Sequence, residues 1–354
     1  MLLIWSVYYF FATSTLITSF TMFDSAENNI CTSLEFFVTL LSIVFGVYHD
    51  RKFQNCLRKF DIVDNTLLKL GTITNYDKLC KKTVWFTLGW FVSVIFLIFS
   101  AALFINNEHN RDLAACLFCC LIQDYCCHIN FIGDLITASI LEYIGLKFDQ
   151  VNEHLHNMIR NNEHKIQAWQ NSIIHPHQHR FSKLTLRTLS SKYIIWIVIH
   201  LHLELRKISC EIDSIFGTQM TFKMACYFAW IAIDLRDIFH AILINNYVKY
   251  KIIFFILHFV WFIHNCFKFL LINYMCETVS TKARATADLL NKLLCFSCDI
   301  EIREIILQFS SQTIYTPLRF CGNGFFQFGF KFLYRFVISV ATVLIIVIQS
   351  HVNK

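Results

Sequence analysis

The chain has 354 residues, of which 56% are hydrophobic and only 16% charged, whereas a soluble domain has about 45–50% and about 25%. Together with just 2 prolines and 9 glycines, this composition excludes a small disulfide scaffold and favours an all-α polytopic membrane protein. The net charge of +6 comes without a basic patch interleaved with aromatic residues, so no nucleic-acid partner is expected. Basic residues between apolar spans instead set topology or contact anionic lipid head groups.

The N-terminal stretch MLLIWSVYYFFATSTLITSF is uncharged and apolar. It is open to interpretation as a signal peptide, but it lacks a basic start and a small-residue cleavage site. About 20 apolar residues suffice to cross a bilayer. The stretch therefore favours a transmembrane helix over residues 2–22.

Six further apolar segments complete a prediction of seven transmembrane helices, at 33–48, 84–105, 113–145, 216–244, 251–276 and 325–349. The segment 113–145 is long, and its helical periodicity continues through LKFDQVNEHLHNMI. The segment 216–244 is the least apolar because it contains Lys223, Asp234, Arg236 and Asp237.

The basic residues predict the orientation of these helices. The alternating loops 49–83, 146–215 and 277–324 contain 22 Lys and Arg residues, and the other set contains 3. The positive-inside rule then places the N-terminus in the cytoplasm and the C-terminus outside. This arrangement is opposite to that of a G-protein-coupled receptor.

The cytoplasmic segments are themselves predicted to be helical. Apolar residues recur every three or four positions, for example at Phe53, Leu57, Phe60, Val63, Leu67 and Leu70. We therefore expect a helical anchor layer inside the cell, formed in part by 49–83 and 146–215. In domain terms, residues 1–276 hold the first six spans with these cytoplasmic extensions. Residues 277–354 hold a cytoplasmic helix and the seventh span.

The C-terminal stretch TVLIIVIQS carries a family pattern. It resembles the end of insect gustatory receptors, which have Thr-Tyr, five apolar residues and then Gln-Phe. Thr342, Leu344 to Ile348 and Gln349 match, whereas Val343 and Ser350 depart from the pattern. Upstream agreement is found at Phe309, Gln312, Pro317, Phe320, Gly324, Phe325 and Phe326, and at Asp213, Phe216 and Gly217 before the fifth span.

This resemblance implies a ligand-gated, non-selective cation channel that detects small-molecule tastants. It implies a tetramer whose last helix lines the pore, either a homotetramer or a heteromer with related receptors. It also implies a multi-pass protein of the plasma membrane, in the dendrite of a sensory neuron. No catalytic residue, cofactor or metal is expected.

The chemistry of the last helix fits a pore. A ring of Gln349 amides has a weak field, so it would pass cations with little discrimination. Ile346 and Thr342 lie on the same helix face, and Ile346 would form an apolar constriction that gates by dewetting. Ser350 stands at a position where the family has a bulky residue, which leaves the exact gate open. The alternative is that Gln349 only ends a helix at the water interface.

Polar and aromatic residues at a shared depth predict a ligand pocket in the outer half. Counted inward at 1.5 Å per residue, Asp124 lies about 18 Å deep, Asp234 and Arg236 about 12–15 Å, and Trp261 about 16 Å. Tyr125 adjoins this level, and Phe96 and Phe99 could form its floor. The aromatic character favours bitter or plant compounds over sugars. The alternative is an internal Asp–Arg ion pair without a ligand role.

Two features suggest other classes of protein. A cysteine group could bind zinc, but within an apolar run cysteine is usually a buried hydrophobe; it comprises Cys116, Cys119, Cys120, Cys126 and Cys127. A di-iron desaturase needs several H-x-x-H-H sets at the membrane face, and the histidines of HPHQH and HLH do not form them. These histidines are His175, His177, His179, His200 and His202. A polytopic membrane enzyme or transporter remains the alternative.

Overall fold

The computed structural model describes residues 26–72, 76–174, 182–243, 251–295 and 299–352. Nearly all of them are helical, which confirms the all-α prediction. The long helices are α2 (Ala26–Lys69), α3 (Tyr76–His109), α5 (Tyr125–Ile174), α6 (Ser182–Leu243) and α7 (Lys251–Leu294). Shorter helices are α4 (Leu113–Gln123), α8 (Ile300–Tyr315) and α9 (Phe330–Val352), and β1 (Cys321–Gly322) pairs antiparallel with β2 (Phe326–Gln327). The expected span 2–22 lies outside the described residues.

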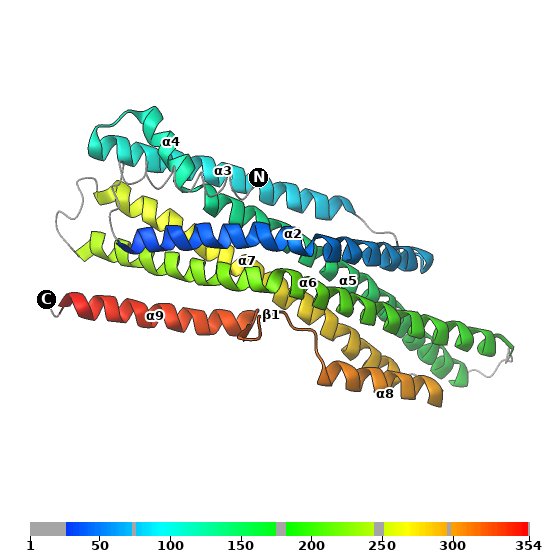
Figure 1. The fold of residues 1–354 in the computed structure, drawn as a ribbon. Coiled ribbons are helices and arrows are strands. Elements are labelled where there is room, and N and C mark those ends of the chain that lie inside the picture. Colours follow the sequence, from blue (N-terminus) through cyan, green and yellow to red (C-terminus); the bar gives the residue numbers. More distant parts are fainter. Residues whose placement is uncertain (1–25, 73–75, 175–181, 244–250, 296–298, 353–354) are drawn as a thin grey trace.

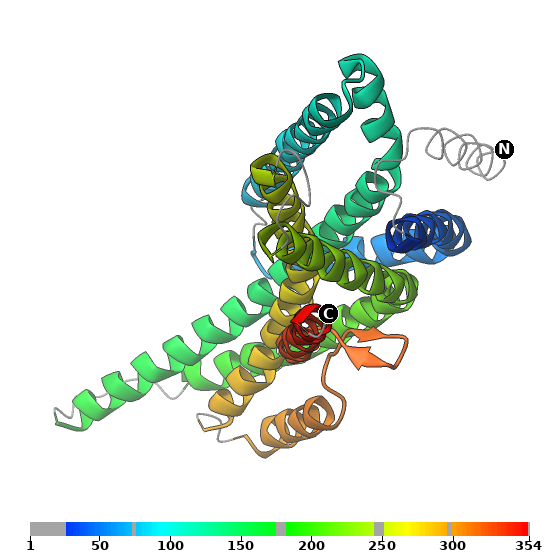
Figure 2. The same ribbon diagram turned by 90° about the vertical axis from the view of Figure 1, so that its left-hand side faces the viewer.

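The helices form an elongated bundle (Figure 1). Helix α7 packs against α5 and α6, and α2 packs against α6, so α6 and α7 make the centre of the bundle. Helix α3, with α4 folded back on it, lies on one side, and α9 lies on the opposite side against α6 and α7 (Figures 1 and 2).

Spans and cytoplasmic extensions are continuous helices rather than separate elements. Helix α2 runs without interruption through the expected span 33–48 and the predicted amphipathic segment after it. Cys56, Phe60, Val63 and Leu67 are buried at helical spacing, whereas Leu57 is 46% exposed. The apolar face was therefore predicted correctly except that Cys56 takes the inward position in place of Leu57.

The expected span 113–145 is two helices. Helix α4 ends at Gln123, and Asp124 has φ −87° and ψ −1° before α5 begins. The two parts bury their apolar faces on different partners: Cys116 and Cys120 of α4 pack against Ile98 and Ala102 of α3, while α5 packs on α7. One straight helix could not make both contacts, and the break at Asp124 reconciles them.

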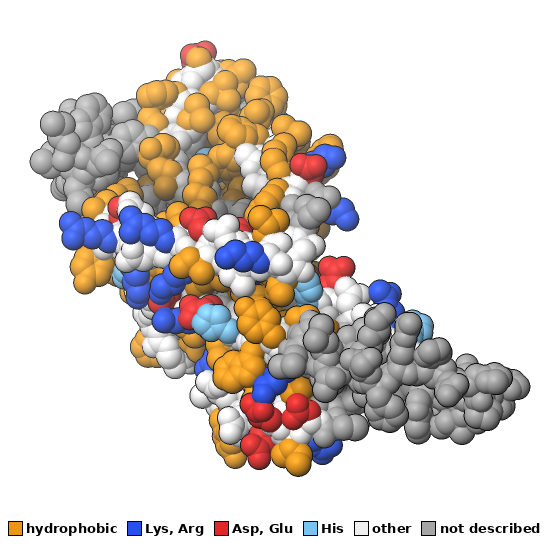
Figure 3. Space-filling model, turned by 90° about the vertical axis from the view of Figure 1, so that its right-hand side faces the viewer, with side chains coloured by type: hydrophobic (Ala, Val, Ile, Leu, Met, Phe, Trp, Pro, Cys, Tyr) orange, Lys and Arg blue, Asp and Glu red, His pale blue; other side chains and the backbone are white. Residues whose placement is uncertain are grey.

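Four helices in the described part of the chain are long and apolar enough to cross a membrane: Ile30–Lys69, Tyr76–Asn107, Tyr125–His164 and Lys251–Leu294. Helix α6, which covers the expected fifth span, is not among them, in keeping with its charged residues. Helix α9 has 23 residues and so a length of about 35 Å, against a hydrocarbon core of about 30 Å. The end of the bundle away from the C-terminus carries many Lys and Arg side chains (Figure 3).

A buried lysine ties two of the long helices together next to the charged end. The Lys147 ammonium of α5 is fully buried and lies 2.7 Å from a carboxylate oxygen of Asp64 on α2. It also lies 4.9 Å from the ring centre of Tyr143 and 5.4 Å from that of Tyr76. This ion pair holds α2 and α5 in register where the expected anchor layer begins.

Candidate functional site

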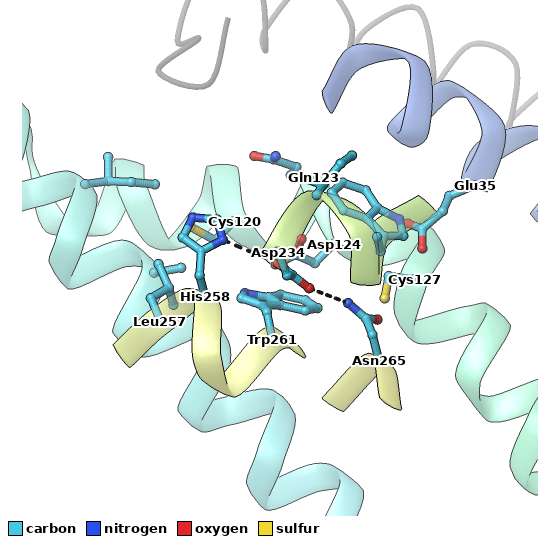
Figure 4. A pocket seen from close by; sticks show the side chains of 14 residues that line it. Glu35, Cys120, Gln123, Asp124, Cys127, Asp234, Leu257, His258, Trp261 and Asn265 are labelled. Carbon is cyan, nitrogen blue, oxygen red and sulfur yellow. Dashed lines mark hydrogen bonds and ion pairs between the residues drawn. The ribbon is translucent and has the colours of Figure 1, made fainter. Parts of the chain in front are cut away.

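A cavity of about 120 Å³ lies between the helices at one end of the bundle (Figure 4). Its polar lining is formed by Glu35 of α2, Gln123 and Asp124 at the α4–α5 junction, Asp234 of α6, and His258 and Asn265 of α7. Its apolar and aromatic lining includes Ile105, Trp230, Ile233, Leu257 and Trp261. The cavity thus depends on the meeting of almost every long helix.

Asp234 is held by two side chains of α7. Its carboxylate accepts a hydrogen bond from the Asn265 amide at 3.0 Å, and the Nδ1 atom of His258 lies 3.3 Å from its other oxygen. Asp234 is 4% exposed. Figure 4 shows it between these two side chains, so the cavity wall joins α6 to α7.

Glu35 lines the cavity, and Lys268 lies beside the lining residue Cys127. Glu35, 5% exposed, is hydrogen-bonded to the indole of Trp230 and the thiol of Cys127. The fully buried Lys268 ammonium lies 2.8 Å from the Cys127 sulfur, and 5.7 Å and 5.5 Å from the ring centres of Phe131 and Tyr227. A buried charge in a membrane is costly unless it is paired. The Cys127 sulfur and the two aromatic rings are the groups that contact the Lys268 ammonium.

A second buried polar group joins α5 to α6. The Lys223 ammonium of α6 pairs with Asp134 of α5 at 2.9 Å and donates to the Asn130 carbonyl at 2.7 Å, and Tyr227 donates to the same carboxylate. A Cβ atom on Gly133 would lie 2.8 Å from the lysine nitrogen, so glycine makes room for this approach. Both charges have partners, so this group serves the packing of α5 on α6.

The structure brings together three of the seven predicted ligand residues: Asp124, Asp234 and Trp261. Arg236 does not line the cavity. It pairs with Asp237 at 2.9 Å and lies next to Val340, Val343 and Leu344 of α9.

Phe96, Phe99 and Tyr125 also lie away from the lining. Phe96 and Phe99 are 55% and 49% exposed on α3, and Tyr125 is 49% exposed. The depth of these residues was estimated along each helix, but depth does not say which way a side chain points.

Sequence reasoning missed Glu35, His258 and Asn265. Glu35 is the lone charge of the expected span 33–48, which was a sufficient signal for an intramembrane site. His258 and Asn265 lie three residues before and four residues after Trp261, hence on the same face of α7. These positions could have been found from their spacing to Trp261.

The predicted pore residues share one exposed face of α9. Thr342 and Gln349 are exposed, and Ile346 is 59% exposed. The side chain of Ser350 lies outside those that are described. The opposite face of α9 packs on the core through Phe332, Leu333, Phe336 and Val340.

The first turn of α9 is held by α7. The Asn273 side-chain oxygen accepts the Gly329 N–H at 3.0 Å, and Glu277 accepts the Phe330 N–H at 3.3 Å. Gly329 has φ +134°, and a Cβ atom there would lie 2.3 Å from the Glu277 carboxylate. Only glycine satisfies both the backbone angle and the close approach.

Helix α6 holds the strand pair that precedes α9. The Asp213 carboxylate accepts the Cys321 N–H at 3.1 Å, and a Cβ atom on Gly217 would lie 3.1 Å from the Cys321 carbonyl oxygen. Burial raises the pKa of Asp213 to about 6, although this hydrogen bond acts in the opposite direction. Asp213 and Gly217, which belong to the sequence pattern, therefore position the hairpin of β1 and β2 on α6.

The sequence model of the 7tm chemosensory receptor family matches residues 1–354. The chain belongs to this family. The receptor is also similar in fold to the insect olfactory receptor OR5 from Machilis hrabei, with a TM-score of 0.63 and 9% identity over 98% of this chain and 87% of that one. The same protein in complex with eugenol matches with a TM-score of 0.64 and 10% identity. No curated protein matches the receptor.

Family membership makes the chain a multi-pass membrane receptor and removes the enzyme alternative. The histidines that suggested an enzyme have another setting. His202 is packed between the rings of Phe148 and Phe309, and burial lowers its pKa to about 4. His175, His177 and His179 lie outside the described residues. Within the described part of the chain, no group of three potential metal ligands occurs.

Proposed function

We propose that this receptor is a gustatory-type, ligand-gated, non-selective cation channel with seven transmembrane helices. A small tastant binds in the cavity of Figure 4, and α9 lines the pore. The N-terminus is cytoplasmic and the C-terminus is extracellular. The receptor works in the plasma membrane of a sensory dendrite, as a homotetramer or with related subunits.

The observation that carries the proposal is the continuity of α7 between the cavity and α9. Leu257, His258, Trp261 and Asn265 line the cavity, and Asn273 on the same helix binds the backbone before α9. The eight residues from Asn265 to Asn273 correspond to about 12 Å along a helix. A shift of α7 on ligand binding is therefore passed directly to the base of α9.

The exposed face of α9 supports its role as the pore lining. Gln349 presents a neutral amide, which replaces part of an ion's hydration without strong selectivity, and monovalent and divalent cations are the expected ions. Ile346 lies one turn inward on the same face. It forms an apolar constriction that blocks ions when water leaves it. Thr342 lies one further turn inward.

The lining of the cavity supports a compact, partly aromatic ligand. A volume of about 120 Å³ is close to that of the engineered cavity of about 150 Å³ that binds benzene. Two indoles line it, and among the described lining residues the side-chain amides are those of Gln123 and Asn265. Bitter or plant compounds are therefore favoured over sugars.

Current recordings from cells that express this chain alone test the function. A panel of bitter and plant compounds is expected to evoke cation current, and Trp261→Ala is expected to raise the half-maximal concentration about tenfold. The loss of a buried aromatic contact of about 1.5 kcal/mol corresponds to this factor.

Trp85→Ala is the matched control, because Trp85 lies on α3 and is 72% exposed. Ion selectivity should be unchanged in both variants. No current with any compound, at normal surface expression, would contradict channel formation by this chain. An unchanged dose response in Trp261→Ala would place the ligand elsewhere.

A further inference from the structure

Three carboxylates face one small cavity in this receptor. Glu35 comes from α2, Asp124 from the α4–α5 junction and Asp234 from α6, and no Lys or Arg occurs among the described residues that line the cavity. Figure 4 shows Glu35 and Asp234 entering the cavity from different helices. We propose that the cavity binds a small organic cation, an arylalkylammonium, between these carboxylates and the two indoles. The inference rests on the proposed function, in that this cavity holds the tastant.

The described acidic groups around the cavity outnumber the basic ones. Among the described residues, two basic groups act on these carboxylates: His258, 3.3 Å from Asp234, and Lys268, whose ammonium lies 2.8 Å from the sulfur of the lining residue Cys127. If both were charged, the three carboxylates would still be in excess by one. A buried charge without a partner is strongly unfavourable, and a cationic ligand supplies the missing partner.

Two indole rings face the cavity together with the carboxylates. Trp230 of α6 and Trp261 of α7 both line the cavity. Among aromatic side chains, tryptophan attracts a cation over its ring face most strongly, and more so when water is excluded. The same rings pack against an aromatic ligand body, so an aryl group joined to an ammonium uses both features.

The lining disfavours the other ligand classes. An anion would meet three carboxylates and no Lys or Arg among the described lining residues. A neutral polyol would leave the excess negative charge without a partner, and the Asn265 amide is already bonded to Asp234. Ile105, Ile233 and Leu257 present no hydrogen-bonding group to such a ligand.

A matched pair of probes tests the inference on the purified full-length receptor. Phenethylammonium and 2-phenylethanol have the same aromatic body and differ by an ammonium in place of a hydroxyl. Binding is measured by the shift in thermal unfolding as each probe is titrated. We expect phenethylammonium to bind at least about tenfold more tightly, since a buried cation next to indole and carboxylate gains at least this factor.

Substitutions then locate the preference. Asp234→Asn keeps the shape and the contact with Asn265 but removes the charge, and it should abolish most of the tenfold preference. Glu35→Gln provides a second variant on another helix. Asp112→Asn is the control, because Asp112 is exposed before α4 and makes no side-chain cap hydrogen bond.

Equal or tighter binding of 2-phenylethanol or of glucose to the wild type overturns the inference, as does the absence of binding by phenethylammonium. An equal loss of the preference for phenethylammonium in Asp112→Asn and Asp234→Asn also overturns it, because it means general attraction of cations to the surface.

Current recordings separate the two proposals. If neutral compounds open a channel that depends on Trp261, the function stands and the cation inference fails. If phenethylammonium binds selectively but no ligand evokes current, the site stands and the channel function fails.

Discussion

At the scale of single residues, the buried charges fall into two groups: those paired with each other and those that line the cavity. Lys223 and Asp134 pair with each other at 2.9 Å and are completed by Tyr227 and the Asn130 carbonyl. Such a closed group fastens helices together. Around the cavity the described acidic side chains come from separate helices and outnumber their basic neighbours, and this imbalance is the basis for the cationic ligand proposed above.

The glutamine near the chain end gives a residue-scale prediction. Gln349→Glu is expected to raise the calcium permeability relative to sodium about fivefold and to create block by external calcium. A unit charge about 4 Å from an ion contributes about 1 kcal/mol even in water, which amounts to this factor. Reversal potentials in calcium-rich solution measure it.

Gln312→Glu is the control, with the same chemical change at an exposed position on α8. It should leave permeability unaltered. Unchanged permeability in Gln349→Glu, at normal surface expression, would mean that the glutamine merely ends a helix.

At the scale of elements, α7 connects the proposed ligand site to the proposed pore. Its N-terminal part forms a wall of the cavity, and its middle part holds the N–H groups of Gly329 and Phe330 through Asn273 and Glu277. Because these bonds reach the backbone rather than a side chain, the first turn of α9 cannot move independently of α7 without leaving the buried Gly329 N–H unpaired.

Asn273→Ala tests this connection. The lost bond leaves a buried N–H without a partner, which costs about 1–3 kcal/mol. We therefore expect the maximal ligand-evoked current to fall about fivefold or more, while binding of ligand to the purified receptor stays the same.

The matched control is Asn291→Ala. Asn291 lies further along α7 and accepts a hydrogen bond from Ser310 of α8 rather than from the α9 segment. An equal loss of current in both variants would indicate general damage to α7 rather than a broken link.

At the scale of the whole molecule, α9 lies at the edge of the bundle (Figure 1). It packs on α6 and α7 with one face and exposes Tyr334, Val337, Ile345 and Ile346 on others. The far end of the bundle carries the basic residues (Figure 3). This arrangement suits an assembly in which several α9 helices meet around an axis.

Epitope staining tests the orientation of the chain. A tag at the C-terminus should be stained on intact cells, and a tag at the N-terminus only after the membrane is permeabilised. The reason is the 22-to-3 distribution of Lys and Arg between the two sets of loops. The reverse pattern would reject the proposed pore, and a projection of the purified particle without four-fold symmetry would reject the tetramer.

The helical class, most of the apolar segments and the family could be predicted from the sequence. These properties depend on local composition and spacing, such as the uncharged runs and the pattern around Gly324, Thr342 and Gln349. The sequence also identified Asp124, Asp234 and Trp261 as unusual intramembrane residues, because a polar group at that depth is costly wherever it points.

Which of these residues contact one another depends on the tertiary structure. Depth along a helix does not fix the direction of a side chain, so Arg236 was expected beside Asp234 but faces α9 and pairs with Asp237. The break at Asp124 likewise results from competition between α3 and α7 for two parts of one apolar run. Such outcomes depend on contacts between distant segments, and the spacing within a single segment does not record them.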